Sequence, residues 1–362
     1  MSIRISNRHL FQTLSGNCSS KILNIAYFVE FRTCYLCTLN VNTIKEIIIL
    51  NLISYINRIV AKGNVDNISR TQYYYRYYVR NPEIEWSFLA SIVSRNAGWN
   101  MTDLKGIYLP QVLPKSLREQ MFHTYERANW LIFLDAFPQL MLHELSKRYN
   151  TSFFHLLKYF HVSEFMQKEW RTFWETKDRK RLMAALIINE QNVIQKPVIS
   201  HPYYKRKVFH SFPFLVQDWL HYSSVLFPTI AGKLYGFSVH DFTDVDERIR
   251  LGKKLAWLLF HPDYYHDFKQ FSERTEHTGS RQDYEQYIGM GKRRDTPFLR
   301  MAFPIIQHHR GDFSDWYKPI KRTEKWFKPI RTPKKYQITN WYLNKQNHLH
   351  NAISILTTKN AW

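Results

Sequence analysis

The sequence predicts an all-α protein: one large body of about ten helices over residues 43–320, followed by a basic, aromatic-rich C-terminal arm. Apolar residues recur at three- and four-residue steps through most of this body, which is the periodicity of amphipathic helices. Glycine, which α/β folds use at many turns, supplies only 11 of the 362 residues. Strand-like and helix-like segments do not alternate, so we expect no parallel sheet and only short β-structure.

Residues 1–63 are expected to form an N-terminal segment, partly irregular, with an amphipathic helix near 43–60. Charged residues and asparagines interrupt its apolar run, so this helix is too polar to span a membrane, and it should pack on the body or on a membrane surface. Cys34 and Cys37 form a Cys-x-x-Cys pair, but three cysteines provide neither four zinc ligands nor a disulfide framework. We therefore expect a reducing, cytoplasmic setting.

A helical domain is expected over 64–317, and its first helices are punctuated by clear signals. One helix should cover 67–79, and a second should start at Asn81-Pro82-Glu83 and end at Gly98. A capping box at 116–119 predicts a long helix to about residue 149. Pro138 should kink or split that helix, because proline removes a backbone hydrogen bond.

Later helices are predicted mainly from capping side chains. Ser163, Asp178 and Asp244 each stand before an apolar-periodic run and are good N-cap residues. Further helices are expected at about 152–160, 214–227 and 263–274.

The helix end and turn around Gly98, within residues 94–106, contain five polar residues that could bind an anion. They are Arg95, Asn96, Asn100, Asp103 and Lys105. An arginine can bind phosphate or carboxylate in two-pronged fashion. The alternative, which we favour, is an ordinary helix end in which Asn and Asp satisfy loose backbone groups.

A second candidate anion site is the turn containing His277, Ser280, Arg281 and Asp283. A helix beginning at Ser280 would direct free backbone N–H groups at a ligand placed before it. The alternative is a capped helix whose arginine pairs with Asp283 or Glu285 on the surface. An enzyme or small-anion binder built from both turns would require them to meet in one pocket.

Motifs for the common enzyme classes are absent from the sequence. It contains no Gly-x-Gly-x-x-Gly, no phosphate-binding loop ending in Gly-Lys-Ser/Thr and no Gly-x-Ser-x-Gly elbow. His261 and His266, with nearby aspartates, could hold a metal, but sixteen histidines make such coincidences easy. We therefore expect no metal site and no cofactor.

The arm, residues 318–362, carries much of the excess charge. The chain has a net charge of +21, and residues 292–362 hold 15 Lys and Arg against 4 Asp and Glu. Such charge draws polyanions. Three prolines suggest an extended arm, and its rings could stack on bases while its cations meet phosphates. The alternative is a solvated arm whose rings pin it to the body. The nucleic-acid candidates are Lys321, Arg322, Lys325, Trp326, Lys328, Arg331, Lys334 and Lys335.

Three stretches together resemble a known bacterial family: residues 69–72, 89–106 and 277–285. They are similar to the YppC-like family of Bacillus and related Gram-positive bacteria, a domain of unknown function, over about residues 64–320. The resemblance implies a bacterial cytoplasmic protein and supplies no catalytic residues.

The sequence leaves the function open. The first hypothesis is a cytoplasmic helical protein that binds a polyanion, most readily nucleic acid, because the charge and the aromatic-basic arm favour it. The second is an enzyme or small-anion-binding protein that uses the 94–103 and 277–285 turns. The third is a scaffold or membrane-peripheral protein.

Overall fold

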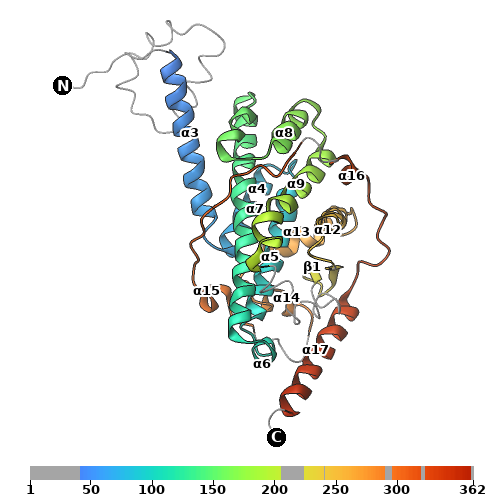
Figure 1. The fold of residues 1–362 in the computed structure, drawn as a ribbon. Helices are drawn as coiled ribbons and strands as arrows, with labels where there is room; N and C mark the ends of the chain where they lie inside the picture. Colours follow the sequence, from blue (N-terminus) through green and yellow to red (C-terminus); the bar gives the residue numbers. More distant parts are fainter. Residues whose placement is uncertain (1–40, 205–223, 240, 290–295, 319–322, 360–362) are drawn as a thin grey trace, which may run out of the picture.

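The computed structural model describes residues 41–204, 224–239, 241–289, 296–318 and 323–359. It confirms a predominantly helical protein, with fourteen α-helices and one two-stranded sheet in these residues. Figure 1 shows the helices gathered around one long central helix, α7. The described elements are α3 (Val41–Gly63), α4 (Asn67–Arg80), α5 (Trp86–Asp103), α6 (Leu109–Val112), α7 (Lys115–Tyr149), the 3-10 helix η2 (Phe154–Phe160), α8 (Glu164–Thr176), α9 (Arg179–Val193), the π-helix η3 (Gln195–Ile199), α10 (Pro202–Tyr204), β1 (Ser224–Pro228), β2 (Leu234–Ser238), α12 (Val245–Leu259), α13 (Tyr265–Arg274), α14 (Gln282–Glu285), α15 (Leu299–Ala302), α16 (Glu324–Phe327) and α17 (Thr339–Lys359).

The main core lies where α4, α5, α7, α9 and α12 pack together. Large rings fill it, among them Trp86, Phe88, Phe133 and Trp170, all buried. Ring pairs such as Phe133 and Phe137 stack at 4.6 Å between centroids, so much of the high aromatic content serves this interior. The apolar face of α3 packs on α7, as expected for the 43–60 helix. No described helix is long and apolar enough to cross a membrane.

Several helix starts follow the predicted capping side chains. Ser163, Asp178 and Asp244 each accept a backbone N–H in the first turn of α8, α9 and α12. The capping box at 116–119 is wrong, because α7 begins at Lys115 behind Pro114 without a side-chain cap. Pro138 does not split α7, which runs through it in the buried core.

Two helix boundaries near the candidate turns differ from expectation. Asn81 is the C-cap of α4, and α5 starts only at Trp86. Gly98 lies inside α5 rather than ending it. A Cβ on Gly98 would stand 2.5 Å from Asn67 Oδ1, so glycine serves a close approach there instead of a helix end.

The predicted helix at 214–227 is wrong in its last residues, since Ser224–Pro228 form strand β1; residues 205–223 lie outside the described chain. β1 pairs antiparallel with β2, with Ser224 opposite Ser238. Asn96 of α5 explains the strand: its amide accepts from Leu226 N at 2.7 Å and donates to Leu226 O at 2.8 Å. A helix at Leu226 would use those backbone groups internally.

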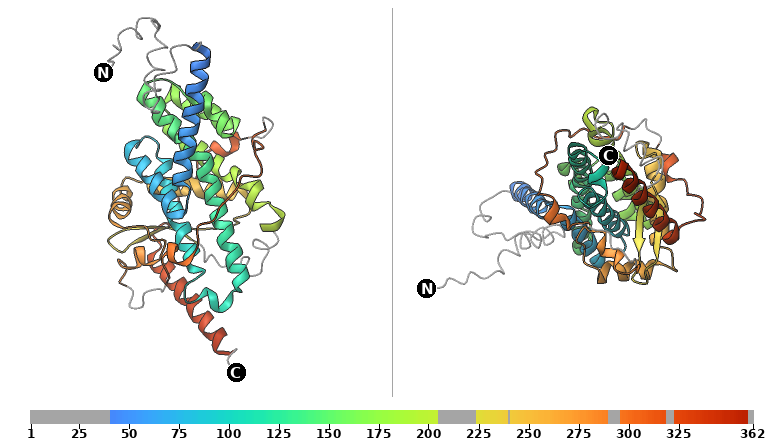
Figure 2. Two further views of the ribbon diagram at one scale, coloured as in Figure 1. Left: turned by 90° about the vertical axis from the view of Figure 1, so that its left-hand side faces the viewer. Right: turned by 90° about the horizontal axis from the view of Figure 1, so that it is seen from below.

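The C-terminal arm is packed on the body, and its last part is a helix rather than an extended chain. Pro329 and Pro333 keep 328–338 extended, but no proline follows, and α17 forms from Thr339. Tyr342, Gln346 and Ile353 are buried at helical spacing. Figures 1 and 2 show α17 at the end of the molecule opposite the start of α3.

Candidate anion-binding groove

The two candidate turns meet, although they are nearly 180 residues apart in sequence. Arg281 Nη2 donates to Asp103 Oδ2 and to Asn100 Oδ1, each at 2.8 Å. Thr102 Oγ1 donates to Gly279 O at 2.7 Å, which joins α5 to the second turn. The predicted surface pair of Arg281 with Asp283 or Glu285 is therefore wrong: the arginine is buried and its partner is Asp103.

The remaining residues of the second turn also find partners inside the protein. His277 Nδ1 lies 3.2 Å from Asp283 Oδ2, and its Nε2 lies 2.9 Å from Asn67 Oδ1. Burial lowers the pKa of His277, and the hydrogen bond with Asp283 opposes that shift. Ser280 Oγ donates to Thr296 O at 2.8 Å. The helix expected at Ser280 is only the four-residue α14, too short for a strong dipole.

Asp283 is held as a carboxylate at the centre of this turn. Burial would raise its pKa, but hydrogen bonds from His277, Thr278 and Trp99 lower it below the ordinary range. The carboxylate therefore organises the turn by accepting several donors at once.

The first turn is likewise mainly structural in its contacts. Arg95 Nη2 donates to Thr275 O at 2.8 Å, and its guanidinium lies 5.3 Å over the Phe271 ring. Burial lowers the pKa of Arg95 to about 10. Lys105, which is exposed, lies over Phe303 at 5.6 Å. The contacts of both turns thus tie α5 to the 275–285 segment, although Arg95 Nη1 is buried without a hydrogen-bond partner in the described residues.

An open site lies instead where the arm crosses α12. Tyr336 O accepts from Gly236 N at 2.8 Å, Ile338 N donates to Leu234 O at 2.9 Å, and Gln337 bridges Tyr235. Residues 336–338 thereby extend the β1–β2 sheet along β2. One cavity remains between the arm, β2 and α12, and a second lies between the arm and α12; Lys254 lines both. We call them together the arm–α12 groove.

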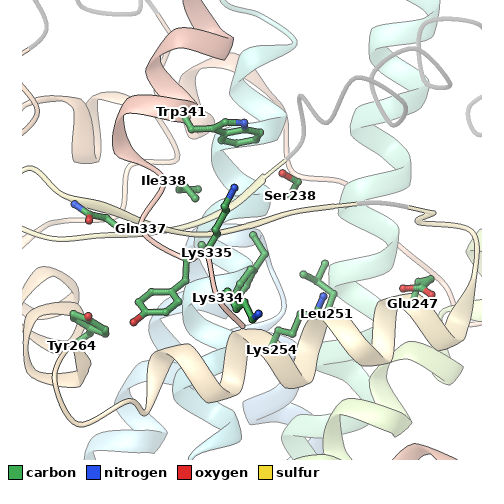
Figure 3. A pocket seen from close by; sticks show the side chains of 13 residues that line it. Ser238, Glu247, Leu251, Lys254, Tyr264, Lys334, Lys335, Gln337, Ile338 and Trp341 are labelled. Atoms are coloured by element: carbon green, nitrogen blue, oxygen red, sulfur yellow. The ribbon is translucent and has the colours of Figure 1, made fainter. Parts of the chain in front are cut away.

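The first cavity, of about 770 Å³, is both aromatic and basic (Figure 3). Trp341 lies on one side and α12 on the other, with Lys334 and Lys335 between them. Hydrogen bonding to Tyr336 raises the pKa of Tyr264, on the cavity wall, to about 12. The lining residues are Gly236, Phe237, Ser238, Glu247, Leu251, Lys254, Tyr264, Lys334, Lys335, Tyr336, Gln337, Ile338 and Trp341.

The second cavity, of about 570 Å³, is lined mostly by cations. The lining residues are Asp246, Ile249, Arg250, Lys253, Lys254, Lys325, Trp326, Lys328, Pro329, Ile330 and Arg331. Across both cavities eight basic side chains face two acidic ones, which gives the groove a strongly positive character.

Some of these cations hold the arm in place. Lys325 Nζ pairs with Asp246 Oδ2 at 2.6 Å, and Trp326 Nε1 donates to Asp246 Oδ1 at 2.7 Å. Lys253 Nζ donates to the backbone oxygens of Trp326, at 2.8 Å, and of Lys328. These contacts fix the arm against one face of α12.

Five other cations have no hydrogen-bond or ion-pair partner within the described residues. They are Lys254, Lys328, Arg331, Lys334 and Lys335. Lys254 is partly buried and the other four are exposed. A row of cations without counter-charges is available to an anion from solvent.

The predicted arm residues that are described all line the groove. Lys325, Trp326, Lys328 and Arg331 line the second cavity, and Lys334 and Lys335 line the first, whereas Lys321 and Arg322 lie outside the described residues. Trp326 is only 9% exposed, so its ring anchors the arm rather than offering a stacking face.

Sequence reasoning missed the contribution of α12 and of Trp341. Arg250, Lys253 and Lys254 recur at three- and four-residue spacing, and this basic face of a predicted helix was a readable signal. Nothing in the sequence indicated that the arm would lie against that face, since the contact depends on tertiary pairing with β2.

The described residues contain no cluster of three or more His, Cys, Asp or Glu side chains that could hold a metal ion. His261 and Asp263 lie 3.8 Å apart and could form at most a weak pair. The Cys34 and Cys37 pair lies outside the described residues.

Fold and groove together define a class: a mostly helical protein whose basic C-terminal arm is packed on its surface. The chain belongs to the family described as "Protein of unknown function (DUF2515)", which matches residues 62–349. It is 47% identical over 316 residues to "Uncharacterized protein YppC" of Bacillus subtilis (strain 168), covering 87% of this chain and 98% of that relative. No solved structure matches the chain. The predicted membership of the YppC-like family is confirmed.

Proposed function

We propose that this protein binds a phosphate-bearing polyanion in the arm–α12 groove. The observation that carries the proposal is the row of five unpartnered cations: Lys254, Lys328, Arg331, Lys334 and Lys335. Closely spaced cations repel one another, and a polyanion relieves that repulsion while releasing its own counterions. A cytoplasmic setting, which the scarcity of cysteine favours, offers such polyanions in quantity.

The arm's fixed course supports this proposal over a purely solvated arm. The arm is held to α12 through Asp246 and to β2 through residues 336–338. Cations on a segment that is already ordered lose less conformational entropy on binding than cations on a flexible segment would. Point substitutions test the groove better than removal of the arm, because removal would also take away the buried Trp326 and Tyr342.

The test is a titration of a fluorescent single-stranded oligonucleotide at two salt concentrations, about 50 and 200 mM. The groove variant carries Lys254→Gln, Lys334→Gln and Lys335→Gln. The logarithm of the binding constant falls as the logarithm of the salt concentration rises, with a slope of about −0.7 per phosphate contact on a single strand. Losing three contacts should therefore make this slope less negative by about 2.

A matched control carries Lys45→Gln, Arg58→Gln and Lys62→Gln on α3. All three side chains are exposed, and α3 and α12 lie on opposite sides of α7 (Figures 1 and 2). The control has the same net charge as the groove variant, so it should keep most of the wild-type affinity. Equal losses in both variants would mean that only overall charge matters, and no binding by the wild type at low salt would end the proposal.

A further inference from the structure

Trp341 stands out among the large aromatic residues of the arm because it is not used to hold the fold. Trp326 and Tyr342 are buried, whereas Trp341 is 37% exposed at the start of α17 and lines the first cavity. Its indole nitrogen has no hydrogen-bond partner in the described part of the chain. An indole in a cavity presents a large apolar face and a donor that a ligand can use.

The cavity around Trp341 has the composition of a site for a flat ring attached to a phosphate. Phe237, Tyr264 and Tyr336 supply further aromatic surface, and Lys334 and Lys335 stand between Trp341 and α12 (Figure 3). Its volume of about 770 Å³ lies in the range of small-ligand pockets, large enough for a nucleotide. An inorganic polyanion would make no use of these rings.

The neighbouring cavity continues the same site with phosphate-binding character alone. Lys254 lines both cavities, and beyond it Lys328 and Arg331 lie along the cation-rich second cavity. Its one large ring, Trp326, is buried and donates to Asp246. The aromatic side chains that could bind a flat ring thus lie in the first cavity, and the cations that could bind phosphates extend from it into the second cavity.

We propose, building on the proposed function, that the first cavity takes an unstacked base of single-stranded nucleic acid while the second cavity holds the adjoining phosphates. Aromatic side chains beside a positive groove bind single strands in this way, because every base has a stacking face. Bases inside a duplex are stacked on one another and cannot enter a cavity. The site therefore selects single strands over duplexes.

Three probes of matched length separate the two proposals: single-stranded oligothymidine, an abasic strand with the same number of phosphates, and a duplex. The wild type should bind oligothymidine about tenfold or more tighter than the abasic strand, since stacking one base contributes about that much. Trp341→Ala should remove this difference, and Trp341→Phe should retain part of it. Neither variant should change binding of the abasic strand.

Phe313→Ala is the control, because Phe313 is an exposed ring beside Arg310 but lies outside the groove lining. It should leave binding of all three probes unchanged. Equal affinities of the wild type for oligothymidine and the abasic strand would overturn the base site while leaving polyanion binding intact. Absence of binding to any probe would remove the proposed function itself. Tighter binding to the duplex would also contradict the base site.

Discussion

Trp326 Nε1 donates a hydrogen bond to Asp246 Oδ1 at 2.7 Å, and this contact joins the C-terminal arm to the first turn of α12. Asp246 Oδ2 accepts from Lys325 at 2.6 Å as well, so one carboxylate holds two consecutive arm residues. The second cavity lies against this junction. The position of the arm, and with it the groove, should therefore depend on Asp246.

Asp246→Ala should loosen the arm and weaken polyanion binding. We expect the free energy of unfolding to fall by about 1 kcal/mol, a modest change because the carboxylate is partly exposed to solvent. Hydrogen bonds from Lys325 and Trp326, working against burial, lower the pKa of Asp246. Its contribution should thus be complete above about pH 4 and fall as pH drops through the lowered pKa.

Urea unfolding at pH 7 and at pH 3 measures this effect. Asp263→Ala is the matched control, since its side chain is 70% exposed and its partner His261 lies 3.8 Å away. The control should change stability by less than about 0.5 kcal/mol. Equal effects of the two substitutions would show that Asp246 does not fasten the arm.

Gly98→Ala should destabilise the protein although it replaces glycine by alanine inside a helix. In an exposed helix this change stabilises by about 1 kcal/mol. Here the new Cβ would stand 2.5 Å from Asn67 Oδ1 and 3.0 Å from His277 Cε1, both buried. We expect a loss of about 1–3 kcal/mol from overpacking, measured by denaturant unfolding.

Gly311→Ala serves as the comparison, because no atom lies within 4 Å of its added Cβ. That variant should match the wild type. A stabilising Gly98→Ala would mean that α5 and the 275–285 segment pack less closely than the structure shows.

Arg281→Gln should be among the most damaging single changes. It would leave Asp103 without its charged partner at 2.8 Å in a site where the two side chains are 6% and 11% exposed. Removing one member of a buried ion pair costs about 3–5 kcal/mol. The midpoint of urea unfolding reports this loss.

Arg80→Gln offers a contrast at the surface. Arg80 pairs with Glu144 at 3.1 Å, but its side chain is 53% exposed. A solvated pair of this kind is worth about 0–1 kcal/mol. If the free energy of unfolding fell by the same small amount in both arginine variants, the contact between the two turns would not contribute strongly to stability.

The buried carboxyl of Asp135 should make stability fall as pH rises. Burial raises its pKa to about 6, opposed by the charge of Arg310 and by hydrogen bonds from Asn189 and Gln139, while Asp315 adds to the rise. The folded state holds its proton more tightly than the unfolded state, whose Asp pKa is about 3.9. On going from pH 5 to pH 8, the contribution of this group to the free energy of unfolding should therefore fall by about 1.4 kcal/mol.

Asp135→Asn should remove that part of the pH dependence. The variant should gain stability relative to the wild type on going from pH 5 to pH 8, measured by urea unfolding at both values. A difference between wild type and variant that stays constant with pH would show that Asp135 has no raised pKa.

Local patterns predicted the helices well where one signal decided the outcome. Ser163, Asp178 and Asp244 cap their helices as side-chain chemistry predicts. Strand β1 was missed because its backbone is held by Asn96, which lies 130 residues away from Leu226. Gly98 was misinterpreted for a similar reason, since His277 and Asn67 explain it and neither is a local neighbour.

The site was only partly predictable for the same physical reason. Charge counting found the arm residues Lys328, Arg331, Lys334 and Lys335, because net charge is visible in the sequence. It did not find Lys254, whose role depends on the arm lying against α12. Arg281 and Asp103 were candidate anion-binding residues beside a favoured structural interpretation, and the sequence did not show that they would pair with each other.

The most direct test of the central claim is hydrogen–deuterium exchange of the full chain with and without a bound single-stranded oligonucleotide. The groove predicts slower exchange on binding in three stretches: 234–238, 247–254 and 325–341. Helix α3, on the other side of α7, should exchange unchanged (Figure 1). Protection confined to α3 or to other surfaces, with these three stretches unaffected, would contradict the arm–α12 groove as the binding site.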